Sequence, residues 1–101
     1  MKLRPLGIAK EIIENTGLQV TYVYDDLIFV EHSPFLIQFD DNNSKNLKLF
    51  FNVDCETDAV VKLTTQLKNA AKARDFIIQN SGKFEMKPKK GSDELEISFI
   101  N

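Results

Sequence analysis

The chain has 101 residues, 43% of them hydrophobic and 28% charged, a composition typical of one globular domain and not of a disordered or fibrous chain. A net charge of −2 and a pI of about 5.3 give no overall field that would attract nucleic acid or an anionic membrane. The single cysteine, Cys55, excludes an internal disulfide and favours a reducing compartment, and no run approaches the roughly 18 apolar residues of a membrane span. We therefore expect one cytoplasmic domain over residues 1–101 that binds neither nucleic acid nor membranes.

The first half of the chain predicts one helix followed by four strands. Apolar residues recur at helical spacing over 5–15, and Gly17 is the residue type that commonly follows a helix end. Short runs rich in β-branched and aromatic residues come next, separated by turn-forming residues such as Asp25-Asp26 and Ser33-Pro34. The strands expected from these runs span residues 18–24, 27–31, 35–39 and 47–53.

The second half predicts a long helix and a closing hairpin. An apolar stripe that includes Val60, Leu63 and Leu67 extends over 56–78, and Asn80-Ser81-Gly82 is expected to end this helix. Two further strands, 83–87 and 94–100, are expected to pair with each other. The order α-β-β-β-β-α-β-β predicts an α+β fold, in which an antiparallel sheet of about six strands carries the two helices on one face.

Turn lengths predict which strand residues share a face of this sheet, because side chains alternate across a strand. A two-residue turn after Tyr24 pairs that residue with Leu27, and a two-residue turn at Ser33-Pro34 pairs Val30 with Ile37. One face is then nearly all apolar and is expected to lie beneath the helices. It carries Thr21, Val23, Ile28, Val30, Phe35, Ile37, Phe39, Leu47, Leu49, Phe51 and Val53.

The opposite face is polar towards the fourth strand but aromatic and aliphatic on the first strands, although a solvated sheet face is usually polar. A contiguous exposed apolar patch typically marks an interface, and tyrosines suit a partly wet partner surface. Two alternatives stay open: cover from within the chain, by the first helix or the final hairpin, and a bulge that exchanges the two faces. The residues expected at a protein interface are Val20, Tyr22, Tyr24, Leu27, Phe29, Leu36 and Phe50.

No motif or residue constellation predicts a catalytic centre. His32, the only histidine, precedes Ser33, but neighbouring strand residues point to opposite faces, so a nucleophilic triad is not expected. Cys55 lies near a helix start, a position that can lower a thiol pKa, but Asp54 and Glu56 beside it oppose thiolate formation. The expected role of Cys55 is therefore that of a small buried residue.

Metal, cofactor and anion sites are not expected either. The 40–44 run resembles a calcium loop only in its polar residues, because it lacks the central glycine and has Phe51 where the bidentate glutamate would stand. Lys87, Lys89 and Lys90 cluster at the last turn without interleaved aromatic residues, so a charged turn that guards an edge hairpin is the simpler interpretation.

The element order, through the strands of residues 18–53, the 56–78 helix and the closing hairpin, resembles that of small acidic secretion-chaperone-like domains. The resemblance covers most of the chain and rests on topology and charge, without a shared motif. It implies a sheet between helices that serves for dimerisation and for holding an unfolded segment of a partner. No functional residue follows from it, because a fold does not determine a function.

The leading functional hypothesis is a non-enzymatic protein-binding or chaperone-like module whose partner is another protein or a second copy of the chain. One alternative is an immunity- or inhibitor-type protein that blocks a basic enzyme through a clustered acidic surface. The other is a small enzyme, which would need a deep pocket containing Cys55 or His32.

Overall fold

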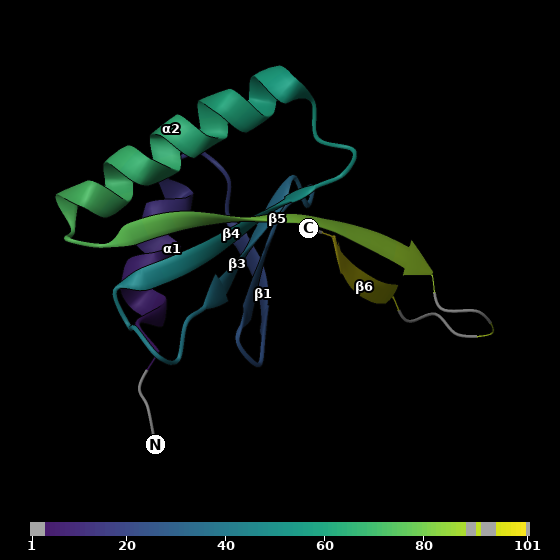
Figure 1. The fold of residues 1–101 in the computed structure, drawn as a ribbon, viewed down its shortest axis with the longest axis horizontal. Coiled ribbons are helices and arrows are strands. Elements are labelled where there is room, and N and C mark those ends of the chain that lie inside the picture. Colours follow the sequence, from purple (N-terminus) through teal and green to yellow (C-terminus); the bar gives the residue numbers. More distant parts are fainter. Residues whose placement is uncertain (1–3, 89–90, 92–94, 101) are drawn as a thin grey trace.

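The computed structural model describes residues 4–88, 91 and 95–100, and this part of the chain contains two helices and six strands (Figure 1). Helix α1 spans Leu6–Glu14 and helix α2 spans Thr57–Ala73; within the described residues neither is long and apolar enough to cross a membrane. The α+β class and the element order α-β-β-β-β-α-β-β are confirmed. The strands are β1 (Val20–Tyr24), β2 (Leu27–Val30), β3 (Phe35–Phe39), β4 (Asn46–Asn52), β5 (Ile77–Pro88) and β6 (Leu95–Ile100).

All six strands belong to one sheet, in the spatial order β1-β2-β3-β4-β5-β6. The neighbouring pairs are antiparallel except for β4 and β5, which run parallel with Leu47 opposite Ile78. A parallel pair needs a crossover connection, and α2 supplies it by returning the chain before β5 begins. The sheet is therefore mixed, and the expectation of a purely antiparallel sheet is wrong in this one pairing.

Helix α2 ends earlier than its apolar pattern predicted, at Ala73 rather than near residue 78. The Phe76 and Asp75 N–H groups donate to carbonyls of the last helical turn at 2.8 and 3.1 Å, which is the hydrogen-bond pattern of a Schellman C-cap. Asp75 occupies the left-handed position of this motif with a φ of +62°, where glycine is usual. The residues expected to end the helix, Asn80-Ser81-Gly82, lie inside β5, at an irregularity in its pairing with β4.

The main core lies between the two helices and one face of the sheet. Ile12 and Ile13 of α1 and Leu63 and Leu67 of α2 belong to one buried cluster with the sheet residues of this face. Both helices thus cover the same side of the sheet, as the alternation of the strands predicted. The sheet residues of the cluster are Ile28, Val30, Phe35, Ile37, Phe39, Leu47, Leu49, Phe51 and Ile78.

The pairing between β2 and β3 differs by two residues from the expected register. Ile37 lies opposite Ile28 rather than Val30, because residues 31–34 form a four-residue loop in which two residues have positive φ. A shift of two residues preserves the face to which every side chain points. The predicted division into two faces therefore holds for these strands although the predicted pairs do not.

A bulge in β1 changes the orientation of its first residues. The register with β2 shifts between Val20 and Tyr22, so Thr21 is the additional residue. Val20 consequently packs against the main core, whereas Thr21 lines a groove on the opposite face. The predicted faces of these two residues are exchanged, but from Tyr22 onward β1 pairs as expected, with Tyr24 opposite Leu27.

The opposite face of the sheet has a smaller core of its own, made of the buried side chains of Leu36, Phe50 and Phe84. Neither helix contributes to this cluster. Figure 1 shows β6 folding back from β5 on the side away from α2, and the Phe99 ring of β6 lies on the Phe50 ring with centroids 4.6 Å apart. The curled end of the sheet therefore covers part of its own second face.

We expect Leu36→Ala to lower the free energy of unfolding by about 2–5 kcal/mol, because it leaves a cavity in the smaller core. Urea denaturation followed by circular dichroism measures this change. Val61→Ala is the control, since Val61 is 62% exposed on α2 and its truncation should change stability by less than about 0.5 kcal/mol. Equal stability of the two variants would show that the curled end does not close over this face.

Candidate protein interface

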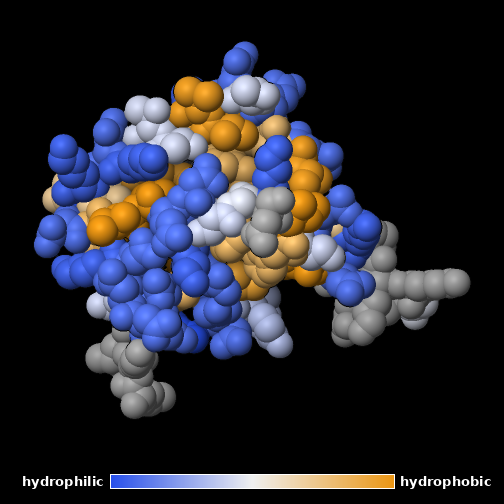
Figure 2. Space-filling view, viewed as in Figure 1, coloured by the Kyte–Doolittle hydropathy of each residue, from blue (hydrophilic) through white to orange (hydrophobic). Residues whose placement is uncertain are grey.

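A groove of about 670 Å³ lies on the concave side of the sheet, between the β1–β2 hairpin and the β5–β6 pair. Figure 2 shows hydrophobic side chains at the surface between the regions that Figure 1 labels β1 and β6. This is the side that carries the smaller core. The residues that line the groove are Thr21, Tyr22, Tyr24, Leu27, Phe29, Ser33, Met86, Ile97 and Phe99.

One wall of the groove is aromatic and open to solvent. Tyr22 stacks on Phe29 with ring centroids 6.0 Å apart, and the Tyr24 ring lies 6.3 Å from that of Tyr22. Because positions 22 and 24 are two apart in one strand, both rings project to the same side. Tyr22 is 55% exposed and Tyr24 63%, so most of this aromatic surface lacks protein contacts.

The facing wall comes from the far end of the sheet. Met86 of β5 lies opposite Ile97 of β6, and Phe99 follows on the same side of β6. Sequence reasoning did not assign these three residues to the candidate interface. The alternation of Ile97 and Phe99 with polar residues was a visible signal, but it does not reveal that a curl brings β6 opposite β1.

The structure separates the residues expected at an interface into two groups. Leu36 and Phe50 are buried in the smaller core, and Val20 contacts the main core, so these three have little surface for a partner. Cover by the final strands, an alternative left open from the sequence, thus applies to part of the patch. The other four residues line the groove; they are Tyr22, Tyr24, Leu27 and Phe29.

His32 and Cys55 line one small pocket of about 210 Å³, together with Asp54. The Cys55 thiol donates to the Glu56 carbonyl at 3.8 Å rather than to the His32 ring. Partial burial, and then the negative charge of Glu56, raise the pKa of the Cys55 thiol above its ordinary value of 9.0. A thiol that stays protonated at neutral pH is a poor nucleophile, so the pocket brings the two residues together without activating the cysteine.

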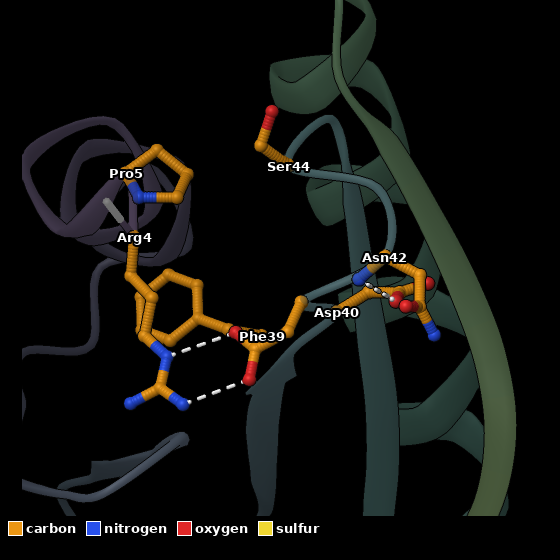
Figure 3. Close-up of a pocket in the computed structure, with 7 residues that line it drawn as sticks. Arg4, Pro5, Phe39, Asp40, Asn42 and Ser44 are labelled. Carbon is orange, nitrogen blue, oxygen red and sulfur yellow. Dashed lines mark hydrogen bonds and ion pairs between the residues drawn. The ribbon is translucent and has the colours of Figure 1, made fainter. Parts of the chain in front are cut away.

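Arg4 forms a separate polar contact between two loops, shown in Figure 3. Its Nε and Nη2 donate to the two carboxylate oxygens of Asp41 at 3.1 and 3.0 Å. Its Nη1 donates to the Asp25 carbonyl at 3.0 Å. The hydrogen bonds to Asp41 raise the pKa of the Arg4 guanidinium. Because the guanidinium is hydrogen-bonded to both loops, we interpret the contacts of Arg4 in this pocket of about 330 Å³ as structural: they hold the start of α1 against two loops of the sheet.

The loop between β3 and β4, which has the polar residues of a calcium loop, is held by its own hydrogen bonds. Asp40 accepts from the Asn42 N–H at 2.9 Å and from the Asn46 side chain at 3.1 Å, and Asn46 also donates to Gln79 of β5 at 2.7 Å. The hydrogen bond from Asn46 holds the pKa of Asp40 below its ordinary value of 3.8. In the part of the chain that the structure describes, no group of three or more His, Cys, Asp or Glu residues could hold a metal ion.

The lysine cluster expected at the last turn falls only partly within the described residues. Lys87 forms an ion pair with Glu85 of the same strand at 2.8 Å, and the hydrogen bond to this carboxylate raises the pKa of Lys87. Lys89 and Lys90 lie outside the described residues. The contact of Lys87 favours the interpretation of a charged strand end over that of an anion site.

The groove combines apolar side chains with a few hydroxyl groups. Among the described residues that line it, Thr21, Ser33 and the two tyrosines carry hydroxyls, and none carries a carboxylate, imidazole, thiol or amine. No family model, curated protein or solved structure matches this chain. The groove itself is therefore the best guide to function.

We expect Cys55 to react with Ellman's reagent more slowly in the folded protein than in the urea-unfolded chain, because the raised pKa keeps the thiol protonated. The rate should increase with pH and still be increasing at the ordinary value of 9.0, because the pKa of the folded thiol lies above it. His32→Ala should leave the rate unchanged. A fast reaction at neutral pH that His32→Ala slows would contradict this and favour a thiol enzyme.

We expect Asn46→Ala to raise the pKa of Asp40 towards 3.8, because the side-chain hydrogen bond to the carboxylate is lost. A group whose pKa is lowered by folding stabilises the protein above its unfolded pKa, and this contribution is lost as the pH falls through the folded pKa. Carboxyl NMR titration below pH 5 measures the shift. Asn42→Ala is the matched control, since only the backbone N–H of Asn42 contacts Asp40; equal titration in the two variants would contradict the assignment.

Proposed function

We propose that this chain is a non-enzymatic protein-binding module that holds an apolar segment of a partner in the groove of its curled sheet. The observation that carries this proposal is the groove lined by exposed tyrosines and apolar side chains, on a sheet face that is usually polar when it faces water. A contiguous apolar surface of this kind costs free energy in the isolated protein and is typical of an interaction site.

The dimensions and chemistry of the groove fit a polypeptide segment. A volume of about 670 Å³ lies within the range of roughly 300–1,000 Å³ that is typical of ligand sites. Tyr22 and Tyr24 offer broad ring surfaces with hydroxyl groups at their ends, and such side chains bind apolar groups while still bonding to peptide groups or water. Met86 adds a flexible thioether, which adapts to partners of different shape.

An enzymatic function has weaker support. The described residues that line the groove include hydroxyl groups, but none of them is a histidine, carboxylate or lysine that could act as a general base for a hydroxyl nucleophile. The pocket that does contain a histidine and a cysteine is small, and the pKa of the Cys55 thiol is raised rather than lowered. An acidic inhibitor would need clustered carboxylates, yet Arg4 bridges Asp25 and Asp41, which reduces the negative field at that end of the molecule.

The test is selection of binders from a phage-displayed library of random peptides, followed by fluorescence anisotropy with the selected peptides. We expect the selected peptides to be rich in large apolar residues. Tyr22→Asp combined with Tyr24→Asp should weaken their binding at least about tenfold, because both substitutions place charge on the exposed aromatic wall. Both side chains are exposed, so the fold should tolerate these changes.

Val61→Asp is the matched control, because Val61 is equally exposed but lies on α2, in the other layer of the fold. It should bind the selected peptides as the wild type does. Circular dichroism of all three proteins checks that they are folded. Failure of the wild type to select any peptide, or binding that survives the tyrosine substitutions, would contradict the proposed function.

A further inference from the structure

The two edges of the sheet border the same groove. Residues of the edge strand β1 line one side, and Ile97 and Phe99 of the other edge strand, β6, line the opposite side. A sheet that curls in this way is an open barrel, with the groove inside and its mouth between β1 and β6. A strand added beside β1 and following the curl would lie over the mouth, with every second side chain pointing into the groove.

The hydrogen bonds of β2 show which backbone groups of β1 are open. The Phe39 N–H donates to the Asp26 carbonyl at 2.8 Å, so the next residue, Leu27, directs its own N–H and carbonyl at β1. Tyr24, the partner of Leu27, closes the two-residue hairpin with it. Alternation along β1 then leaves Val23 with both backbone groups at the open edge of the sheet.

Strand β1 has little of the protection that natural edge strands carry. Its residues, Val20–Tyr24, include no proline and no charged side chain, and the last four are exposed. The bulge at Thr21 protects only the beginning of the strand. An uncharged open edge beside an apolar groove is the arrangement that proteins use to bind peptides by strand addition.

The charged residues around the groove favour one kind of binding segment. None of the described residues that line the groove is charged, whereas Asp26 lies at one end of β1 and Glu31 beyond the other. Asp26 accepts a hydrogen bond from the Gln38 side chain at 2.8 Å and Glu31 from the Gln19 N–H at 3.0 Å, and both donors are neutral. These contacts leave the negative charges of Asp26 and Glu31 in place. Arg4 pairs with Asp25 and Asp41 near Asp26, which leaves one guanidinium against three carboxylates at that end. Complementarity therefore favours a strand that is uncharged in its middle and basic at its ends.

We infer that the occupant of the groove is an extended segment of another protein that pairs with β1 as a seventh strand. The segment has large apolar residues at alternate positions and a lysine or arginine at each end. This inference rests on the protein-binding function proposed above and specifies how the partner is held. Val23 provides the pairing N–H and carbonyl, while Tyr22, Tyr24 and Phe99 contact the inward side chains.

The probe is a fluorescent peptide amide of about nine residues, long enough to extend past the five residues of β1 at roughly 3.4 Å per residue. It alternates threonine with valine or leucine and has lysine at both ends. Single N-methyl groups are placed on successive backbone amides, and fluorescence anisotropy measures binding to the wild-type protein. Methylation of the amide that pairs with Val23 should weaken binding about tenfold, and methylation of the amides on either side of it should change binding little, because those amides point away from β1. Equal effects of methylation at neighbouring amides would overturn strand addition.

Two substitutions at one position test the same pairing from the side of the protein. Val23→Pro removes the outward N–H and spares the hydrogen bonds to β2, because proline is tolerated where an edge N–H faces solvent. It should weaken binding of the lysine-ended peptide about tenfold. Val23→Thr keeps the N–H and should bind as the wild type does. If Val23→Pro does not fold, the N-methyl series on the wild-type protein still decides the question.

The outcomes separate this inference from the function on which it rests. Peptides from the library that are lost with the tyrosine substitutions but bind Val23→Pro normally would leave the protein-binding function in place and overturn strand addition. Absence of binding by any peptide, the library included, would overturn both. Light scattering of the protein alone is the remaining measurement: a dimer that Val23→Pro separates would identify a second copy as the occupant and overturn the inference.

A version of the peptide with glutamate at both ends tests the charge of the partner. It should bind more weakly than the lysine-ended peptide at low salt, and the difference should shrink as salt screens Asp26 and Glu31. Equal affinity of the two peptides at low salt would overturn the assignment of basic ends.

Discussion

Strands β3 and β4 carry large apolar side chains on both faces, so water has to be excluded from both sides of the sheet at its centre. Phe35 and Ile37 project towards the helices, while Leu36 and Phe50 project to the other side. The two described helices both lie on the first side, and the sheet therefore covers the second side by curling. The curl closes over Phe50 through Phe99 but stops short of the β1–β2 hairpin. The groove and its exposed tyrosines are what this incomplete closure leaves open.

Sequence patterns predicted the first four strands well because their pairing is local and the side-chain period of a strand is two. The β2–β3 register was wrong, yet the error was an even number of residues, so Ile28 and Ile37 still shared the predicted face. The bulge at Thr21 could not be inferred, because threonine and valine occur in both regular and bulged strands. That single residue decides that Val20 belongs to the main core while Tyr22 belongs to the groove.

The second half of the chain was harder to predict because its helix and strand patterns merge. Phe76, Ile77 and Ile78 continue the apolar stripe of α2, and the left-handed position just after the helix is occupied by Asp75 rather than by the usual glycine. If the helix is extended to residue 78, the next strand is predicted to begin only at residue 83, and its parallel pairing with β4, which starts at Ile77, is missed. The second wall of the groove depends on this pairing, because β5 positions β6 opposite β1. The wall of the groove that β5 and β6 form therefore could not be predicted from local sequence patterns.

The parallel β4–β5 pair also has a kinetic consequence. The hairpins from β1 to β4 close short loops. The pairing of Asn46 with Ile77 closes a much longer loop that contains all of α2, and pairings between residues far apart in the sequence form slowly. We expect the first four strands of a folding chain to pair before β5 and β6 join the sheet. During that interval Leu36 and Phe50 face water. The surface that later becomes the groove is therefore exposed first as a hydrophobic patch that is prone to nonspecific association.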